Sequence, residues 1–246
     1  MVGMHKSTVS RLCATLESAG YLQRDPVTNR FSLGARIYQL SGAPTRDIDL
    51  RAIARPALLE LVETTRETAT LAVRDGRDIV TIDVVDGLNF VRMQARAGMR
   101  TQVHASAVAK AVLAWTPKAE LDEILDAWPM ARLTPNTITS KRDLVQHLAE
   151  VRSRGYSVDL EEMEVGLRCV GAPIRDHTGK VAAGVSISGP RHRMTEDAIA
   201  ALGPEVRHTA DQISRRLGAP HVDAIAPGGH EPPVAGSPSA AVAEGA

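Results

Sequence analysis

The chain is poor in cysteine and aromatic residues and has no long apolar run, and these scarcities exclude several classes of protein. Two cysteines, Cys13 and Cys169, are too few for a fold held by disulfides, and neither belongs to the closely spaced pair typical of a zinc site. No stretch approaches the roughly 18 consecutive apolar residues that a membrane-spanning helix needs. The first residues also lack the apolar segment of a signal peptide, so we expect a cytoplasmic protein.

The composition that remains is that of an ordinary globular protein, with 43% apolar and 24% charged residues in a chain of 246. This length suits one or two domains of about 100–200 residues each. Lys plus Arg and Asp plus Glu both number 29, but residues 1–36 carry five basic and two acidic side chains. Residues 219–246 contain five prolines, four glycines and no Lys or Arg, so we expect a disordered tail there.

The first forty residues have the pattern of a helix followed by a hairpin. Apolar side chains recur at helical spacing in 5–19, and two short β-rich runs at 21–25 and 30–34 flank a turn. A winged helix-turn-helix has this order, with a helix in the major groove and a wing along the DNA backbone. The surplus of positive charge is also compatible with a solvated basic helix. The candidate DNA contacts are Lys6, Ser7, Thr8, Arg11, Asn29 and Arg30.

The rest of the chain alternates between helical and β patterns. Apolar spacing predicts a helical connector over 47–67, which Pro56 should split into two helices. Strands are expected at 68–74, 78–85, 89–95, 156–160, 167–175 and 180–188, and helices at 105–115, 118–127, 140–153 and 195–217. This mixture predicts an α+β fold, in which helices pack on an antiparallel sheet.

Several separated motifs resemble those of the IclR (isocitrate lyase regulator) family of bacterial transcriptional regulators. The run HKSTVSRLCATLESAGYLQRDPVTNRFSLGARI at 5–37 is similar to the DNA-binding half of that family. The runs HASAVAKAVLA at 104–114 and GYSVDLEEMEVGLRCVGAPIRDHTGKVAAGVSISGPRHRMT at 155–195 are similar to its effector-binding half. The resemblance implies a winged helix-turn-helix joined by a helical linker to a GAF/PAS-like effector-binding domain with an antiparallel sheet.

The resemblance also implies a division of the chain into four segments. These are a winged helix-turn-helix over 1–40, a helical linker over 41–67, an effector-binding domain over 68–218 and the tail over 219–246. Family members carry two further helices before the recognition helix, whereas five residues precede Lys6 here. A recognition helix alone cannot bury its apolar face. We therefore expect either a misassigned start codon, which we favour, or a form that has lost DNA binding.

A candidate effector pocket begins with two serines in the run VSISGP. Ser186 and Ser188 lie two positions apart, so on a strand both hydroxyls project from one face and could hold a small carboxylate. They could equally belong to a solvated face. The resemblance implies a pocket that combines an apolar wall with polar contacts, a mixture that suits small organic ligands. Its residues are Phe90, Met93, Ala107, Val108, Asp159, Cys169, Ser186 and Ser188.

Catalytic and metal-binding interpretations of these residues are less favoured. Cys169 could be a nucleophile with His104 or His177 as its base, but a lone cysteine in an apolar strand is usually a buried small side chain. The acidic run at 159–164 could bind a metal or form an acid–base pair, but a charged loop edge is the simpler interpretation. We expect no catalytic residue, no metal and no cofactor.

These observations predict a ligand-responsive transcriptional regulator and not an enzyme. The expected partners are a double-stranded DNA operator and an effector that is a small organic acid or an aromatic catabolite. A homodimer or homotetramer is expected because paired recognition helices read two half-sites. Two alternatives remain, which are a free-standing small-molecule-binding sensor module that has lost DNA binding and a cysteine-dependent hydrolase.

Overall fold

The computed structural model describes residues 5–26, 28–34, 36 and 50–220. The chain divides into two compact units, Met1–Asp49 and Leu50–Ala246. This division falls within the linker predicted over 41–67, and residues 50–67 belong to the second unit. The tail predicted over 219–246 lies almost entirely outside the described residues. The four-segment division of the chain therefore stays a prediction.

The first unit contains one described helix and a hairpin, as the sequence predicts. They are α1 (Lys6–Ser18), β1 (Leu22–Arg24) and β2 (Phe31–Leu33), with the two strands antiparallel. The helix gives way to the hairpin at Gly20, whose φ of +78° is the left-handed conformation that glycine adopts readily. The hairpin turn is closed by Asp25, whose side chain accepts the backbone N–H of Thr28 at 2.8 Å. Residues within the unit, such as Gly20 and Asp25, thus determine where the helix ends and where the hairpin turns.

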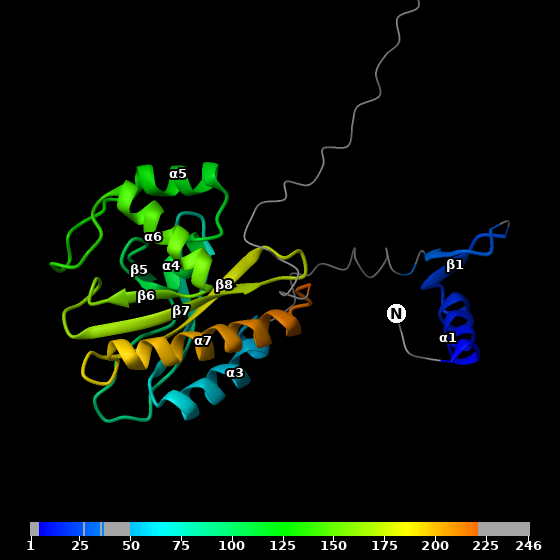
Figure 1. Ribbon diagram of the computed structural model, residues 1–246, viewed down its shortest axis with the longest axis horizontal. Helices are drawn as coiled ribbons and strands as arrows, with labels where there is room; N and C mark the ends of the chain where they lie inside the picture. Colours follow the sequence, from blue (N-terminus) through cyan, green and yellow to red (C-terminus); the bar gives the residue numbers. More distant parts are fainter. Residues whose placement is uncertain (1–4, 27, 35, 37–49, 221–246) are drawn as a thin grey trace, which may run out of the picture. The chain divides into compact units, whose positions relative to one another are not determined.

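A six-stranded antiparallel sheet lies at the centre of the second unit (Figure 1). Its strand order is β5-β4-β3-β8-β7-β6, so the two central strands come from distant parts of the chain. The strands are β3 (Thr68–Asp75), β4 (Asp78–Val85), β5 (Arg100–Thr101), β6 (Ser157–Leu160), β7 (Leu167–Arg175) and β8 (Val181–Pro190). This sheet confirms the predicted α+β fold class with an antiparallel sheet.

Helices cover both faces of this sheet. On one face lie α3 (Leu50–Thr65) and α7 (Glu196–Arg216), and on the other lies α4 (Ala107–Leu113), backed by α5 (Lys118–Ala127) and α6 (Lys141–Arg154) (Figure 1). Each layer has its own apolar core, because the alternating side chains of the strands point to opposite faces. Among the described helices, none is both long and apolar enough to cross a lipid bilayer.

The prediction that Pro56 splits the connector is wrong, because α3 runs through it without interruption. Pro56 lies on the exposed side of the helix, where its ring meets solvent. The opposite side buries Ala54, Leu58 and Leu61 against the sheet and α7. This burial outweighs the loss of one backbone donor, which proline cannot supply.

The strand predicted at 89–95 is also wrong, since this segment is part of an irregular loop between β4 and β5. Its carbonyl groups bond to side chains: Thr68 Oγ1 donates to the Met93 carbonyl at 2.9 Å, and Arg193 donates to the Val91 carbonyl at 2.9 Å. The short strand β5 pairs with β4 in its place. The apolar residues that suggested a strand include Phe90, which is 99% exposed.

Helix α4 approaches the sheet closely because glycines lie beneath it. A Cβ atom on Gly171 would lie 2.9 Å from the backbone carbonyl of Ala107, and one on Gly184 would lie 2.9 Å from Val108 Cγ2. These distances are too short for any side chain. The Ser157 hydroxyl donates to the Ala107 carbonyl at 2.6 Å and fixes the start of α4 over the sheet.

Candidate functional site

The strand register brings polar side chains from four strands together on the face beneath α4. Asp159 lies opposite Cys169, and Cys169 lies opposite Ser188. Two residues before Ser188 on β8, Ser186 lies opposite Thr70 of β3. Directly opposed residues of antiparallel strands project from the same face of a sheet. We call these five residues, Thr70, Asp159, Cys169, Ser186 and Ser188, the polar row.

The polar row lines a small cavity of about 80 Å³. The five residues of the row are at most 7% exposed, so a ligand in the cavity would be removed from water. The Ser186 and Thr70 hydroxyls share a hydrogen bond of 2.7 Å, in which one hydroxyl donates and the other accepts, so the O–H of the accepting hydroxyl can donate elsewhere. The apolar part of the wall is formed by Met93, Met99, Val108 and Leu167. The cavity therefore combines hydroxyl groups with an apolar wall.

Most of the residues assigned to an effector pocket from the sequence meet at this cavity, namely Met93, Val108, Asp159, Cys169, Ser186 and Ser188. Ala107 is instead buried where α4 touches the sheet, and Phe90 is exposed on the loop before β5. Their assignment as effector contacts stays a prediction. Thr70 and Thr81 also line the cavity and were not identified from the sequence. The alternation of TATLAVR does place Thr68 and Thr70 on one strand face, which is a usable signal.

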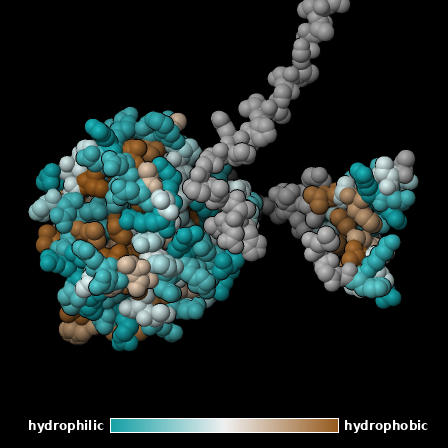
Figure 2. All heavy atoms as spheres, in the orientation of Figure 1, coloured by the Kyte–Doolittle hydropathy of each residue, from teal (hydrophilic) through white to brown (hydrophobic). Residues whose placement is uncertain are grey.

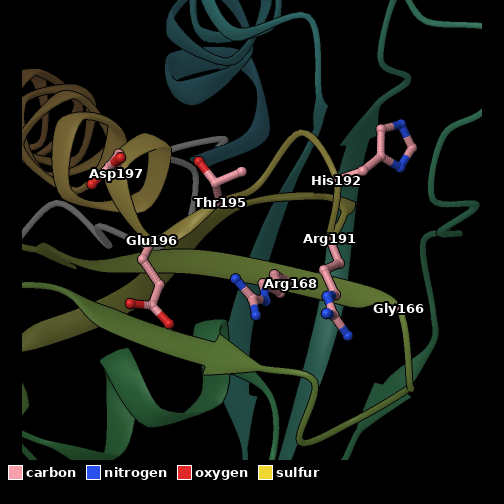
Figure 3. Close-up of a pocket in the computed structure, with 7 residues that line it drawn as sticks. All are labelled: Gly166, Arg168, Arg191, His192, Thr195, Glu196 and Asp197. Carbon is pink, nitrogen blue, oxygen red and sulfur yellow. The ribbon is translucent and has the colours of Figure 1, made fainter.

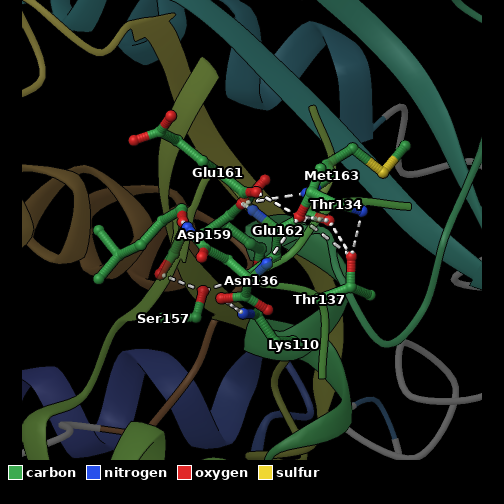
Figure 4. Close-up of polar contacts among 12 residues, drawn as sticks. Lys110, Thr134, Asn136, Thr137, Ser157, Asp159, Glu161, Glu162 and Met163 are labelled. Atoms are coloured by element: carbon green, nitrogen blue, oxygen red, sulfur yellow. Dashed lines mark hydrogen bonds and ion pairs between the residues drawn. The ribbon is translucent and has the colours of Figure 1, made fainter. Parts of the chain in front are cut away.

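Asp159 is the acidic member of the polar row, and its two carboxylate oxygens differ. Oδ1 accepts the backbone N–H of Glu162 at 2.7 Å and that of Met163 at 3.4 Å (Figure 4). Oδ2 is buried and has no hydrogen-bond partner among the described residues. Burial raises the pKa of this carboxyl, while the positive charge of Lys110 opposes the rise. Asp159 therefore brings an unsatisfied oxygen to the cavity that it lines.

Beside Asp159 lies an ion pair that the sequence did not reveal. Lys110 on α4 is fully buried, and its Nζ lies 2.5 Å from Glu162 Oε1 (Figure 4). Burial lowers the pKa of Lys110 and raises the pKa of Glu162 to about 7. In both cases desolvation disfavours the charged form more than the pairing favours it.

The interpretation of the acidic run at 159–164 as a charged loop edge is therefore wrong for three of its four acidic residues. Asp159, Glu161 and Glu162 are each at most 7% exposed. The cations that allow this burial come from distant parts of the chain, since Lys110 pairs with Glu162 and Arg168 lies 3.2 Å from Glu161. The described residues contain no group of three or more His, Cys, Asp or Glu side chains placed to hold a metal ion.

The surroundings of Cys169 do not favour a nucleophile. Burial raises the pKa of the thiol well above its ordinary value, and the neighbouring Asp159 carboxylate adds to this effect. A reactive cysteine needs the opposite shift, toward the thiolate. Of the two histidines considered as its base, His104 bonds to the Ala131 carbonyl at 2.9 Å, and His177 is exposed in a turn. Cys169 thus behaves as a weakly polar wall of the cavity.

A larger and more open depression of about 700 Å³ lies at the start of α7 (Figure 3). Its basic residues are already paired, because Arg168 and Arg191 lie 3.2 Å and 3.6 Å from Glu161. Glu196 and Asp197 line the same depression and add negative charge. An anionic ligand would compete with these carboxylates in open solvent, so the polar row is the better candidate site.

The residues assigned to DNA contact are exposed in the first unit, where a ligand could reach them. They are Lys6, Ser7, Thr8, Arg11, Asn29 and Arg30. Within the described residues, α1 buries none of its side chains, and Leu12 and Leu16 are 46% and 42% exposed. Figure 2 shows apolar side chains on the surface of this unit. The contacts with DNA stay a prediction.

Comparison with known proteins finds relatives over most of the chain. A family model described as "Bacterial transcriptional regulator IclR C-terminal" matches residues 43–215, and one described as "IclR helix-turn-helix domain" matches residues 1–26. The chain is 38% identical over 216 residues to the HTH-type transcriptional regulator KdgR of Dickeya chrysanthemi, covering 86% of this chain and 71% of that protein.

A second relative and a solved structure agree with this match. The HTH-type transcriptional regulator XynR of Escherichia coli (strain K12) is 33% identical over 220 residues, covering 89% of this chain and 87% of XynR. The crystal structure of Thermotoga maritima IclR superposes with a TM-score of 0.67 and 37% sequence identity, covering 87% of each chain. The two sequence relatives are transcriptional regulators by name, and neither is named as an enzyme.

The buried glutamate generates a prediction about stability. Because the pKa of Glu162 is raised from 4.5 to about 7 in the folded protein, its contribution to stability is complete below pH 4.5 and is lost as the pH rises through about 7. The difference corresponds to about 3 kcal/mol. We expect the free energy of unfolding of the natural protein to fall by about this amount between pH 4.5 and 7.5, relative to Glu162→Gln.

Urea unfolding at a series of pH values measures this difference. The control is Glu164→Gln, because Glu164 lies in the same loop and is exposed. Its curve should run parallel to that of the natural protein. Parallel curves for Glu162→Gln as well would contradict the assignment of a raised pKa to Glu162.

Proposed function

Because the chain belongs to the IclR family of bacterial transcriptional regulators, we propose that it is a DNA-binding regulator whose activity responds to a small carboxylate bound at the polar row. The observation that carries this proposal is the set of buried hydroxyl groups that open onto one cavity. Ser186 and Ser188 project from the same face of β8 and can donate to the two oxygens of one carboxylate.

The size of the cavity favours a small acid over an aromatic catabolite. An apolar cavity of about 150 Å³ is what holds a single benzene ring in an engineered protein. The cavity beside the polar row has about half that volume, about 80 Å³. A carboxylic acid with a short aliphatic chain fits this space, with its chain against Met93 and Val108 and its carboxylate toward the serines.

The effector would act by favouring one arrangement of the two units or of two chains. It can shift such an equilibrium only by as much as its affinity differs between the two arrangements. A homodimer or homotetramer is part of the proposal, since a helix-turn-helix protein reads two half-sites with paired recognition helices. In this scheme α1 and the hairpin β1–β2 contact DNA through Lys6, Arg11 and Arg30.

A sensor module without DNA binding is the second candidate function. The observation that favours it is the exposure of the apolar side of α1, where Leu12 is 46% exposed and no residue is buried among those described. A recognition helix in a working domain packs this side against other helices. The two candidates differ in one property, which is binding of the purified chain to duplex DNA.

We expect the double variant Ser186→Ala with Ser188→Ala to lose the response to the effector and to keep binding to DNA. Each removed hydroxyl is a donor to a charged group, which is worth about 1.5–3 kcal/mol, so the affinity for a small carboxylate should fall by at least about tenfold. Calorimetric titration with two- to five-carbon aliphatic acids measures this affinity.

Ser153→Ala is the matched control, because Ser153 is exposed on α6 and lies outside the cavity. It should bind the same acids as the natural protein does. An unchanged affinity in the double serine variant would defeat the assignment of the polar row as the effector site.

We expect Arg11→Ala to weaken binding to DNA fragments that tile the intergenic regions around the gene. Loss of one phosphate contact should reduce the slope of log affinity against log salt by about 1, whereas loss of a base contact should cost about 1–3 kcal/mol. Arg142→Ala is the control, since Arg142 is an exposed arginine of α6 in the second unit. Electrophoretic mobility shift across several salt concentrations measures both quantities. Absence of binding by the unaltered chain to every fragment would favour the sensor module.

A further inference from the structure

The charges around the proposed carboxylate site do not balance. Asp159 and Glu162 are two buried carboxyl groups, and Lys110 is the buried cation that lies beside them. With all three groups ionised the cluster carries one net negative charge. A ligand carboxylate entering the cavity would add a second negative charge beside buried carboxyl groups. Like charges at short range among buried groups repel strongly, so a binding mode without compensation is unfavourable.

The other groups that face Asp159 do not supply the missing positive charge. Cys169 on β7 stays a neutral thiol, because burial raises its pKa. His147 on α6 lies near Lys110, and burial together with the charge of Lys110 lowers the pKa of this histidine to about 4. Arg154 at the end of α6 acts on Lys110, but its guanidinium donates to the Tyr156 carbonyl at 2.7 Å. Arg100 on β5 lines the cavity, but it is largely exposed and lies 3.2 Å from Asp78.

We propose that the effector enters as a carboxylate together with one proton, which Asp159 Oδ2 holds and donates to the ligand, and that Lys110 and Glu162 are positioning residues that create this requirement. The proposal rests on the proposed function, because it concerns the ligand of the polar row. The proton comes from solvent, and no covalent bond to the ligand forms or breaks. Protonation adds one positive charge and cancels the charge that the ligand brings.

The hydrogen bonds of Asp159 determine which oxygen receives the proton. Oδ1 already accepts from the backbone N–H groups of Glu162 and Met163, and a protonated oxygen would accept less well there. Oδ2 is buried, and apart from the weak donor of the facing Cys169 thiol it has no partner in the described part of the chain, so a proton on it is available to a ligand in the cavity that Asp159 lines. A carboxylate in the cavity would satisfy this donor and would in turn be held by the hydroxyls of Ser186 and Ser188.

Lys110 keeps the empty cluster from holding this proton permanently. Lys110 favours the ionised form of both carboxyl groups, whereas the negative charge of Asp159 favours protonation of Glu162. The pKa of Glu162 near 7 indicates where the empty cluster exchanges its additional proton. Below this pH the cluster already carries the proton, which lies on Glu162 while the site is empty and on Asp159 Oδ2 once the ligand is bound. Above this pH, binding must recruit the proton from solvent.

The test is calorimetric titration of the full chain with butyrate and with its neutral analogue butyramide, between pH 6 and 9. The affinity for butyrate should be level below about pH 7 and should fall about tenfold per pH unit above it, because one proton is bound per ligand. Titration at pH 8 in buffers of different ionisation enthalpy should give an uptake close to one proton per butyrate. The affinity for butyramide, which brings no charge, should not fall as the pH rises.

Two variants distinguish proton donation by Asp159 from a purely structural role of this residue. In Asp159→Asn the amide oxygen takes the place of Oδ1 under the two backbone N–H groups, and the NH2 group permanently replaces the protonated Oδ2. This variant should bind butyrate without pH dependence, and more tightly than the natural protein at pH 8.5. Glu162→Gln removes the negative charge beside Asp159, so butyrate affinity should begin to fall at a lower pH than in the natural protein.

The outcomes distinguish this proposal from the proposed function. Butyrate affinity that is constant from pH 6 to 9, or zero proton uptake at pH 8, would overturn the proton coupling while leaving the effector site in place. A folded Asp159→Asn variant that binds no butyrate would overturn it as well. If the natural protein binds butyrate at no pH, the carboxylate assignment itself fails, and both proposals fall.

Discussion

The close packing of α4 on the sheet is the interaction on which the rest of the second unit depends. It is possible because Gly171 and Gly184 present no side chain to the helix, and the Ser157 hydroxyl anchors its first carbonyl. This packing closes the space above the polar row and turns a sheet face into a buried cavity. It also carries Lys110 into the interior, where a lysine is stable only beside a carboxylate.

The two faces of the sheet consequently have different roles. The face covered by α3 and α7 is an apolar core, with Leu58, Ile187 and Ile213 fully buried. The face under α4 mixes an apolar layer with buried hydroxyl and charged groups, some of which lack hydrogen-bond partners among the described residues. Such unsatisfied groups destabilise a folded protein, and one of them, Asp159 Oδ2, belongs to a residue that lines the cavity. The apolar face supplies the stability that permits this arrangement.

Local patterns in the sequence predict most helices and strands. They do not predict which residues pair with buried charges. The helix at 118–127 and the wing hairpin were predicted from periodicity and turn residues, which are local signals. The prediction at Pro56 failed because burial of the opposite side keeps α3 continuous. The prediction at 89–95 failed because side chains from elsewhere, such as Thr68, bond to the carbonyl groups of this segment. The burial of Glu162 depends on Lys110, which lies 52 residues away. Likewise, Thr70 and Ser186 meet across 116 residues, a pairing that only the sheet order reveals.

The central claim is that the polar row holds a small carboxylate, and a crystal structure of the full chain grown with butyrate tests it most directly. The account predicts density for butyrate in the cavity, with its oxygens within hydrogen-bond distance of Ser186 Oγ, Ser188 Oγ and Asp159 Oδ2 and its chain against Met93 and Val108. Butyrate bound instead in the open depression beside Arg191 and His192, with the polar row empty, would contradict the account.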